Sequence, residues 1–287
     1  MTTTTGTRRG DPWNGALGRH WAAHDQRFDA MLGDIDDALF AAADIGPGDR
    51  VLDIGCGAGA TTRTAARLAA PGHAVGVDIS GPLVERARAR TAEEGVGNAA
   101  YELGDAQTHR FPPGGYDVAI SRGGVMFFDD HVTAFANVAR ALRRGGRLVF
   151  VCPRAPGPQS EESTALGLFA RRLAEDAPDG AQAEADPDAR AAHTAMASLA
   201  EPYQVHAALH RTYERIAVNP VDVHTRWGDS PADAVDFLLS RTPRRQVSAA
   251  TRAALEDTLR PYATARGVRT RAGVWLVTAV RRDDARV

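Results

Sequence analysis

The sequence contains no lysine: all 34 of its basic residues are arginines, balanced by 36 acidic residues. Without lysine the chain cannot form a lysine Schiff base, which excludes pyridoxal-phosphate chemistry, and it lacks the lysine of a phosphate-binding P-loop. The formal net charge of −2 argues against bulk electrostatic binding of nucleic acid, although a local arginine patch is not excluded. Any anionic group of a substrate would have to be held by arginine.

Cysteine and long apolar runs are also scarce. The two cysteines, Cys56 and Cys152, are too few for a disulfide framework or a four-ligand zinc site. No run approaches the roughly 18–20 apolar residues of a membrane-spanning helix. The first ten residues, MTTTTGTRRG, contain no apolar segment typical of a signal peptide. We therefore expect a cytoplasmic globular protein with no membrane partner.

From residue 46 to residue 154 the hydrophobic pattern alternates between strand and helix. It predicts strands at 50–54, 74–78, 99–103, 116–121 and 147–152, with helices at 60–69, 82–94 and 131–143. Repeated strand–helix–strand units form parallel sheets with right-handed crossovers. The fold class expected for this core is α/β, a Rossmann-like doubly wound sheet that is mainly parallel, with an antiparallel last strand.

The segments on either side of this core have other patterns. Residues 1–45 contain apolar side chains at helical spacing, which predicts an N-terminal helical segment that covers the site. A mainly helical cap, predicted to contribute the acceptor pocket, is expected over 155–212 and 228–270, with helices at 163–174, 231–239 and 248–265. Its polar stretch near 175–190 is predicted to be a surface loop, with a mobile lid as the alternative. Closing strands of the core are predicted within 213–227 and 271–283, the second including the apolar run 274–280.

The segment VLDIGCGAGATT is the most informative part of the sequence. A hydrophobic strand runs directly into Gly55-Cys56-Gly57-Ala58-Gly59, and a helix follows. Glycine permits a sharp turn and a close approach of the backbone to a ligand, and the helix N-terminus offers free N–H groups. Gly55, Gly57 and Ala60 also satisfy the loose dinucleotide pattern G-x-G-x-x-[G/A]. A nicotinamide-dependent oxidoreductase is therefore an alternative.

Three acidic residues stand at or beside the ends of three successive predicted strands. Asp78 could accept two hydrogen bonds from ribose hydroxyls, and Asp105 could bind an adenine amino group. Asp53 precedes the first glycine by two residues, where it would repel a pyrophosphate but suits the cationic amino-acid end of S-adenosylmethionine, directly or through water. Each acid alone could be a helix cap or a turn residue. Together they favour a ligand site, because open α/β sheets bind ligands at the carboxyl edge.

These segments resemble the class I S-adenosylmethionine-dependent methyltransferases, and in particular a bacterial subgroup that acts on small molecules. The resemblance covers about residues 49–154 and rests on VLDIGCGAGATT, GVDIS, GDAQTHRFPPGGYDVAISRGGVMFF and ALRRGGRLVFVCPR. The closing AGVWLVTAVR is similar to the last strand of the family, whereas 155–270 matches loosely. Gly123 and Pro153 depart from the pattern, since a larger residue is expected at the first and tryptophan is frequent at the second.

The resemblance implies a role for each matching residue. It implies that the cofactor S-adenosylmethionine is bound by Asp53, Gly55, Gly57, Asp78, Ile79, Asp105, Ala106 and Ser121. The two glycines would contact its methionyl part with Asp53 nearby, and Asp78 would hold the ribose, with Ile79 against the adenine. The pair at 105–106 would bind the adenine edge, and Ser121 would line the site after the fourth strand. Cys56 is expected to be a small buried filler.

Candidate residues on the acceptor side are fewer. Trp13 and Trp21 are expected to cover the cofactor and to form one wall of the acceptor pocket. His24 is a candidate catalytic base, although a surface histidine without an orienting partner is the commoner case. Arg122, at the carboxyl end of a strand, is a second catalytic candidate. Its alternative role is a salt bridge to Asp129 or Asp130.

No metal site is expected. His206 and His210 lie four residues apart on a predicted helix, but no accompanying carboxylate motif completes a ligand set.

The predicted function is methyl transfer from S-adenosylmethionine to a small-molecule acceptor, of natural-product or lipid-like type. One alternative is an NAD(P)-dependent oxidoreductase, against which stand the missing Tyr-x-x-x-Lys and the position of Asp53. Another is a non-catalytic cofactor-binding scaffold on the same fold. Nucleic acid is a less favoured partner because no basic surface signature is present. The sequence does not indicate an oligomeric state.

Overall fold

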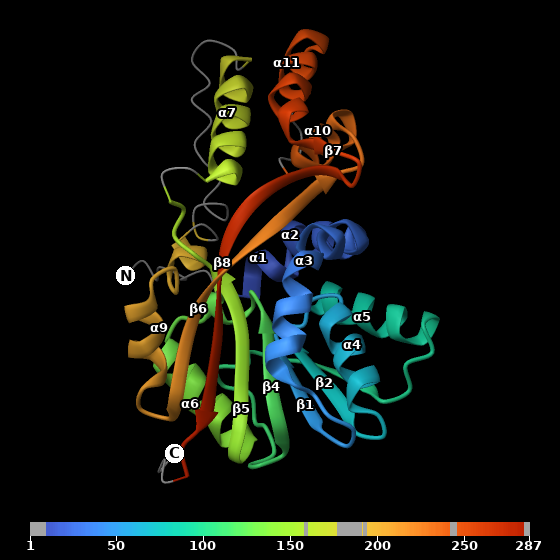
Figure 1. Cartoon of the computed structure of the whole chain (residues 1–287). Helices are drawn as coiled ribbons and strands as arrows, with labels where there is room; N and C mark the ends of the chain where they lie inside the picture. Colours follow the sequence, from blue (N-terminus) through green and yellow to red (C-terminus); the bar gives the residue numbers. More distant parts are fainter. Residues whose placement is uncertain (1–9, 158–159, 177–190, 192–193, 242–245, 284–287) are drawn as a thin grey trace, which may run out of the picture.

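The protein forms one mixed sheet flanked by helices, and the computed structural model describes residues 10–157, 160–176, 191, 194–241 and 246–283 (Figure 1). The strands are β1 (Arg50–Ile54), β2 (His73–Asp78), β3 (Ala99–Leu103), β4 (Tyr116–Arg122), β5 (Leu142–Pro153), β6 (Tyr213–Gly228), β7 (Ala263–Thr264) and β8 (Gly267–Arg281). Their order in the sheet is β3-β2-β1-β4-β5-β8-β6, and β7 pairs with β8. Neighbouring strands from β3 through β5 are parallel, whereas β8 is antiparallel to both β5 and β6. The expected mainly parallel sheet with an antiparallel last strand is confirmed.

Helices cover both faces of this sheet. They are α1 (Gly10–Asn14), α2 (Ala16–Ala23), α3 (Asp25–Ala43), α4 (Ala60–Ala69), α5 (Gly81–Glu93), α6 (His131–Ala141), α7 (Glu161–Glu175), α9 (Pro202–Leu209), α10 (Pro231–Ser240) and α11 (Ala249–Leu259). Side chains of α3 and α4 pack with β1, β2 and β4 in one apolar cluster, and those of α6 and α9 pack in another on the opposite face. Burial of these two clusters supplies the main driving force for the layered arrangement.

Local sequence signals set where several of these helices begin. Ser80 caps α5, because its hydroxyl accepts a hydrogen bond from the Leu83 N–H, and Pro82 occupies the first turn. Asp130 caps α6 in the same way through the Thr133 N–H, at 3.0 Å. Helix α6 ends at Ala141, two residues earlier than predicted, because Leu142 already pairs with Tyr116 at the start of β5.

Strands β6 and β8 are longer than the parallel strands and extend past their carboxyl ends, where α7, α10 and α11 lie (Figure 1). These three helices share an apolar cluster with α3 that includes Phe28, Phe169, Phe237 and Leu255. The arrangement places a mainly helical layer next to the carboxyl edge of the parallel strands. The division of the chain into core and cap stays a prediction.

The sequence-based element boundaries are wrong at two places near the C-terminus. The helix expected over 248–265 ends at Leu259, and the chain continues through the 3₁₀ turn Arg260–Tyr262 into β7. Pro261 lacks the N–H that a continuing helix needs. Strand β8 begins at Gly267 instead of residue 274, because its arginine-rich first half pairs with β6 across a partly exposed surface. The polar loop predicted near 175–190 lies almost wholly outside the described residues.

Candidate active site

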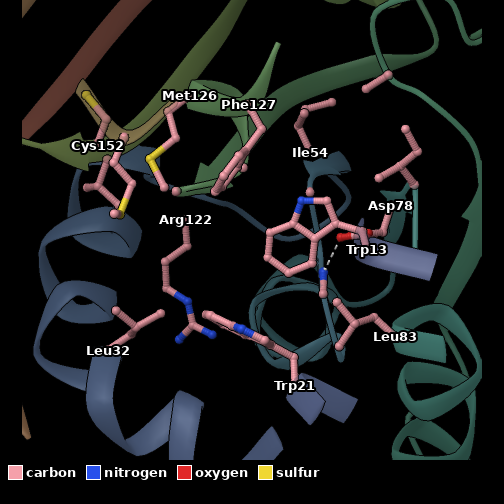
Figure 2. Close-up of a pocket in the computed structure, with 18 of the residues that line it drawn as sticks. Trp13, Trp21, Leu32, Ile54, Asp78, Leu83, Arg122, Met126, Phe127 and Cys152 are labelled. Atoms are coloured by element: carbon pink, nitrogen blue, oxygen red, sulfur yellow. Dashed lines mark hydrogen bonds between the residues drawn. The ribbon is translucent and has the colours of Figure 1, made fainter. Parts of the chain in front are cut away.

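A cavity of about 360 Å³ lies at the carboxyl ends of β1 to β5. The strand order reverses between β1 and β4, and open α/β sheets bind ligands at such a switch point. Of the residues singled out from the sequence, those that line it are Trp13, Trp21, Gly55, Gly57, Asp78, Ile79, Asp105, Ala106 and Arg122. Figure 2 shows Asp78 and Leu83 on one side of the cavity and Cys152 and Leu32 on the other.

The glycine loop forms the floor of the cavity after β1. Gly55 has a φ of +67°, and a Cβ there would stand 2.7 Å from the Gly124 Cα, so both backbone conformation and space require glycine. Gly57 has a φ of +54°, and its missing Cβ leaves open space. The Gly57 N–H donates to Asp78 Oδ2 at 2.8 Å. The loop is therefore held in place from the neighbouring strand and leaves backbone accessible to a ligand.

Asp78 lines the cavity at the end of β2, and its carboxylate links the glycine loop to the loop after β2. Besides the bond from Gly57, its Oδ1 accepts a hydrogen bond from the Ser80 N–H at 2.9 Å. Burial raises the pKa of the Asp78 carboxyl, and the bonds from Ser80 and Gly57 partly oppose that shift. Because each carboxylate oxygen has two lone pairs, both oxygens retain capacity for further hydrogen bonds from ribose hydroxyls.

Asp53 lies beneath the glycine loop and does not line the cavity. Its side chain is 0% exposed, and its Oδ2 accepts hydrogen bonds from the Thr61 and Thr62 hydroxyls at 2.7 and 2.6 Å. Its Oδ1 is buried and has no partner among the described residues. Burial raises the pKa of this carboxyl to about 6. An unpartnered buried oxygen is rare in folded proteins and indicates a missing donor.

The remaining cofactor candidates take two different positions. Asp105 and Ala106 line the cavity after β3, and Asp105 Oδ1 accepts a hydrogen bond from the Gln107 N–H at 2.9 Å. Ser121 is fully buried and does not line the cavity. Its hydroxyl donates to the Ile54 carbonyl at 2.7 Å and accepts from the Gly124 N–H at 3.1 Å. Ser121 therefore joins the end of β1 to the loop after β4 and supports the site without facing the cavity.

An aromatic cover closes the cavity above the glycine loop. Trp13 packs edge-to-face with Trp21 at 5.7 Å and with Phe127 at 5.4 Å between ring centroids (Figure 2). Helix α1, which carries Trp13, is held by the loop after β2: the Ser80 hydroxyl donates to the Trp13 carbonyl at 2.6 Å, and the Gly81 N–H donates to Asn14 Oδ1 at 2.8 Å. The same loop thus positions both the cover and Asp78.

Arg122 lines the cavity, but the ion-pair partners expected from the sequence are wrong. Its guanidinium pairs with Asp29 at 2.6 Å and with Asp36 at 2.9 Å, both on α3, and not with Asp129 or Asp130. The physical reason is that α3 crosses the carboxyl end of β4, while Asp130 caps α6. Nearby Asp36 and Asp29 raise the pKa of Arg122 against the opposing effect of burial, so the side chain stays cationic.

The structure does not bring His24 to the cavity. This residue joins α2 to α3, and its Nδ1 lies 2.9 Å from the His20 carbonyl. Its ring packs against the His20 ring, with 4.4 Å between centroids. The position agrees with the commoner interpretation of His24 as a histidine outside the site.

Several cavity residues were not identified from the sequence. Phe127 and Cys152 follow β4 and end β5, and the rule that sites form at strand ends could have found both. Arg241, directly after α10, carries no such signal. Gly123 and Pro153, the two departures from the family pattern, also line the cavity. Within the described ranges, no group of three or more potential metal ligands and no helix able to span a membrane is present.

These features fit S-adenosylmethionine. The orphaned Asp53 oxygen lies at the glycine loop, where the ammonium of the methionyl part is expected, and Asp78 and Asp105 lie along the same edge. The acidic side chains at this end suit a ligand that carries a sulfonium and an ammonium.

Comparisons with known proteins agree with this geometry. Residues 51–146 match the family model described as a methyltransferase domain. Nocamycin O-methyltransferase of Saccharothrix syringae is 38% identical over 119 residues, which cover 41% of this chain and 42% of that protein. Aklanonic acid methyltransferase DauC of Streptomyces sp. (strain C5) is 39% identical over 107 residues, 37% of this chain and 49% of that protein. The match thus spans less than half the length of each relative.

A solved structure extends the likeness beyond this segment. The phosphoethanolamine N-methyltransferase 2 of Haemonchus contortus, in complex with S-adenosyl-L-methionine, has a TM-score of 0.59 and 16% identity. The alignment covers 96% of this chain and 60% of that one. At this identity the likeness shows the fold alone. The sequence matches over residues 51–146, the strand order and the glycine loop together make this part of the chain similar to the class I S-adenosylmethionine-dependent methyltransferases, whose cofactor is S-adenosylmethionine.

Proposed function

We propose that this protein transfers the methyl group of S-adenosylmethionine to a small-molecule acceptor of natural-product or lipid-like type. The observation that carries the proposal is one continuous cavity with two chemically different ends. Asp78 and the glycine loop line one end, and Leu32, Met196 and Val274 contribute to an apolar wall elsewhere in the same cavity. A cofactor bound at the first end would present its reactive group toward the second.

The protein's part in this reaction is alignment and exclusion of water. When bound, S-adenosylmethionine supplies a methyl group that forms a bond with an acceptor lone pair while the carbon–sulfur bonding pair returns to sulfur. Asp78 would orient the ribose, and the buried Asp53 oxygen would accept a hydrogen bond from the ammonium directly or through water. Trp13 and Trp21 keep bulk water from the reacting atoms. Such positioning supplies much of the rate acceleration when the leaving group is already activated.

Apart from Asp78 and Asp105, which are assigned to the cofactor, the described residues of the cavity lining offer no general base. Among the described residues that line it there is no histidine and no tyrosine. Burial raises the pKa of the Cys152 thiol to about 12, so this thiol is neutral near pH 7. The acceptor atom must therefore be nucleophilic in itself or ionised before it enters. Carboxylates, enolates of acidic carbonyl compounds and acidic phenols meet that requirement.

The relatives support the small-molecule class. Two of them are named nocamycin O-methyltransferase and aklanonic acid methyltransferase DauC, and both names refer to small molecules. The chain carries acidic residues, not a basic surface, at the ligand edge, which disfavours nucleic acid as the acceptor. A nicotinamide oxidoreductase is disfavoured because a pyrophosphate at the glycine loop would lie near Asp53, whereas the position of Asp78 suits either cofactor.

Calorimetric titration of S-adenosylhomocysteine and of NADH tests the cofactor assignment. We expect S-adenosylhomocysteine to bind and NADH not to bind. Asp78→Ala should weaken S-adenosylhomocysteine binding by about 1.5–3 kcal/mol, the usual cost of losing hydrogen bonds to a charged group. Asp130→Ala is the matched control, since it removes a helix-capping carboxylate away from the cavity. It should lower the melting temperature and leave affinity intact.

Two outcomes would contradict this assignment. Unchanged affinity in Asp78→Ala with a lower melting temperature would mean that Asp78 only holds backbone. Tight NADH binding without S-adenosylhomocysteine binding would favour the oxidoreductase. Transfer of a labelled methyl group to a metabolite in an extract of the native cells separates an enzyme from a scaffold, because a scaffold would bind the cofactor and label nothing.

A further inference from the structure

The charged side chains that line the cavity differ in whether a described residue of opposite charge pairs with them. Among the described lining residues there are four: Asp78, Asp105, Arg122 and Arg241. The two acids belong to the cofactor end, at β2 and β3. The charge of Arg122 is neutralised by its two ion pairs with α3. Arg241 therefore carries the uncompensated positive charge at the acceptor end of the cavity.

Arg241 has no anionic partner in the described part of the chain. It follows α10, it is exposed, and it is one of the residues that line the cavity. No carboxylate of a described residue stands at ion-pair distance from its guanidinium, and no described side chain or carbonyl accepts a hydrogen bond from it. Glu162 is the acid near enough to affect it, but Glu162 does not line the cavity.

The cation of Arg241 has no paired counter-charge among the described residues that line the cavity. Burial lowers the pKa of Arg241, an effect that Glu162 partly opposes, and the charge of Arg241 contributes with burial and His24 to a lowered pKa of His20. Arginine nonetheless stays protonated in proteins. Arg241 is exposed and lines the cavity, so its guanidinium is open to an incoming anion. A charged residue that lines a cavity and has no described counter-charge is a candidate for binding a ligand of opposite charge.

The rest of this end of the cavity is apolar. Met31 and Leu32 come from α3, Met196 precedes α9, and Val274 comes from β8. Methionine side chains adapt to irregular apolar ligands. A ligand that satisfies both the apolar wall and Arg241 has a hydrophobic body and one anionic group.

We propose that Arg241 recognises the acceptor by pairing with an anionic group, a carboxylate on an otherwise apolar small molecule. The guanidinium presents a planar pair of N–H donors that matches a carboxylate in bidentate geometry. The proposal rests on the proposed methyl transfer, because it assigns the chemical class of that acceptor. It makes Arg241 a specificity-determining residue with no part in binding the cofactor.

Two fluorescent dyes of nearly the same shape test this role. The probe 8-anilinonaphthalene-1-sulfonate carries one anionic group that stands in for the carboxylate, and N-phenyl-1-naphthylamine has the same apolar body without it. Both are titrated into the full chain with saturating S-adenosylhomocysteine. The proteins are wild type, Arg241→Gln, Arg241→Lys and, as the matched control, Arg252→Gln. Arg252 is a partly exposed arginine of α11 that pairs with Asp236 outside the cavity.

The expected result is selective loss of the anionic dye. Arg241→Gln should weaken binding of the sulfonate dye about tenfold or more, while Arg241→Lys should lose less because it keeps the charge. Binding of the neutral dye should change less than about twofold in every variant, and Arg252→Gln should match wild type. Because Arg241 has no partner to lose, Arg241→Gln should keep the wild-type melting temperature.

Three results would overturn the role of Arg241. They are unchanged affinity of Arg241→Gln for the sulfonate dye, an equal loss for both dyes, and a wild type with no saturable site for the sulfonate dye. None of these would affect the proposed methyl transfer if S-adenosylhomocysteine still binds. Failure of the wild type to bind S-adenosylhomocysteine would instead reject the proposed function itself.

Discussion

Asp53 is a carboxyl group whose environment favours its neutral form. It is fully buried and accepts two threonine hydroxyl bonds on one oxygen, while the other oxygen has no described partner. Burial raises its pKa from 3.8 to about 6. The ionised form therefore destabilises the folded state. Full stability is present below pH 3.8 and is lost as the pH rises through about 6.

Replacing Asp53 with asparagine should remove this pH dependence. We expect the free energy of unfolding of Asp53→Asn, relative to wild type, to rise by about 2 kcal/mol between about pH 4.5 and pH 7.5. Urea unfolding of both proteins across that range measures it. Asp117→Asn is the control. The bonds that Asp117 accepts from Arg50 and Arg143 outweigh burial and hold its pKa well below 3.8, so its difference from wild type should be nearly flat. A flat difference for Asp53→Asn would contradict the raised pKa.

At the residue scale, the positions of side chains near strand ends can be predicted from the sequence. The partners of side chains that are contacted by distant elements cannot. Gly55, Asp78 and Asp105 could be placed at one edge because parallel strands end together. The partners of Arg122 could not, because Asp29 and Asp36 approach from a helix whose crossing position has no local signal. Arg241 reaches the cavity only through the packing of α10 against α3, a contact distant in sequence.

At the element scale, the cover of the cavity depends on the tight corner between α1 and α2. Gly18 lies within α2, and a Cβ at this position would stand 1.7 Å from the Trp13 carbonyl oxygen. The backbone of α1 would have to move, and with it Trp13. Gly33 in α3 is also a helical glycine, but nothing stands within 4 Å of its missing Cβ.

Alanine at these two glycines should therefore have opposite effects. Gly18→Ala should lower the free energy of unfolding by about 1–3 kcal/mol, the usual cost of overpacking, and should weaken S-adenosylhomocysteine binding. Gly33→Ala should raise it by up to about 1 kcal/mol through helix propensity and leave affinity unchanged. Chemical denaturation and calorimetry measure both properties. Wild-type affinity in a destabilised Gly18→Ala would show that the cover does not contribute to cofactor binding.

Element boundaries follow the same division between local and distant causes. The starts of α5 and α6 are visible as Ser80 with Pro82 and as Asp130, because capping is local chemistry. The first half of β8 could not be predicted from the sequence, because this arginine-rich segment forms a strand by pairing with β6, which comes from a distant part of the chain. Strand propensity measures fit to such neighbours more than a backbone preference.

At the scale of the whole molecule, the cavity is lined mainly by the N-terminal helices and the ends of β1 to β5, with Met196, Arg241 and Val274 from later segments. Helices α7 and α11 contribute none of its described lining residues. These two helices pack with α10 and α3 in an apolar cluster around Phe169 and Leu255. A ligand stabilises chiefly the segments it contacts, and amides that exchange by local opening report those segments separately. Cofactor binding should therefore have little effect on the local opening of α7 and α11.

Hydrogen exchange at short labelling times should show this independence. Saturating S-adenosylhomocysteine should slow exchange at least severalfold in residues 13–21, 55–59 and 78–81, because the proposed cofactor site is lined by the glycine loop, Asp78 and the α1–α2 corner. Exchange in α7 and α11 should stay unchanged, and NADH at the same concentration should change none of these segments. Slowing in α7 and α11 with S-adenosylhomocysteine alone would mean that the far helices are coupled to the cofactor end. In that case the cap would respond to the cofactor before any acceptor enters.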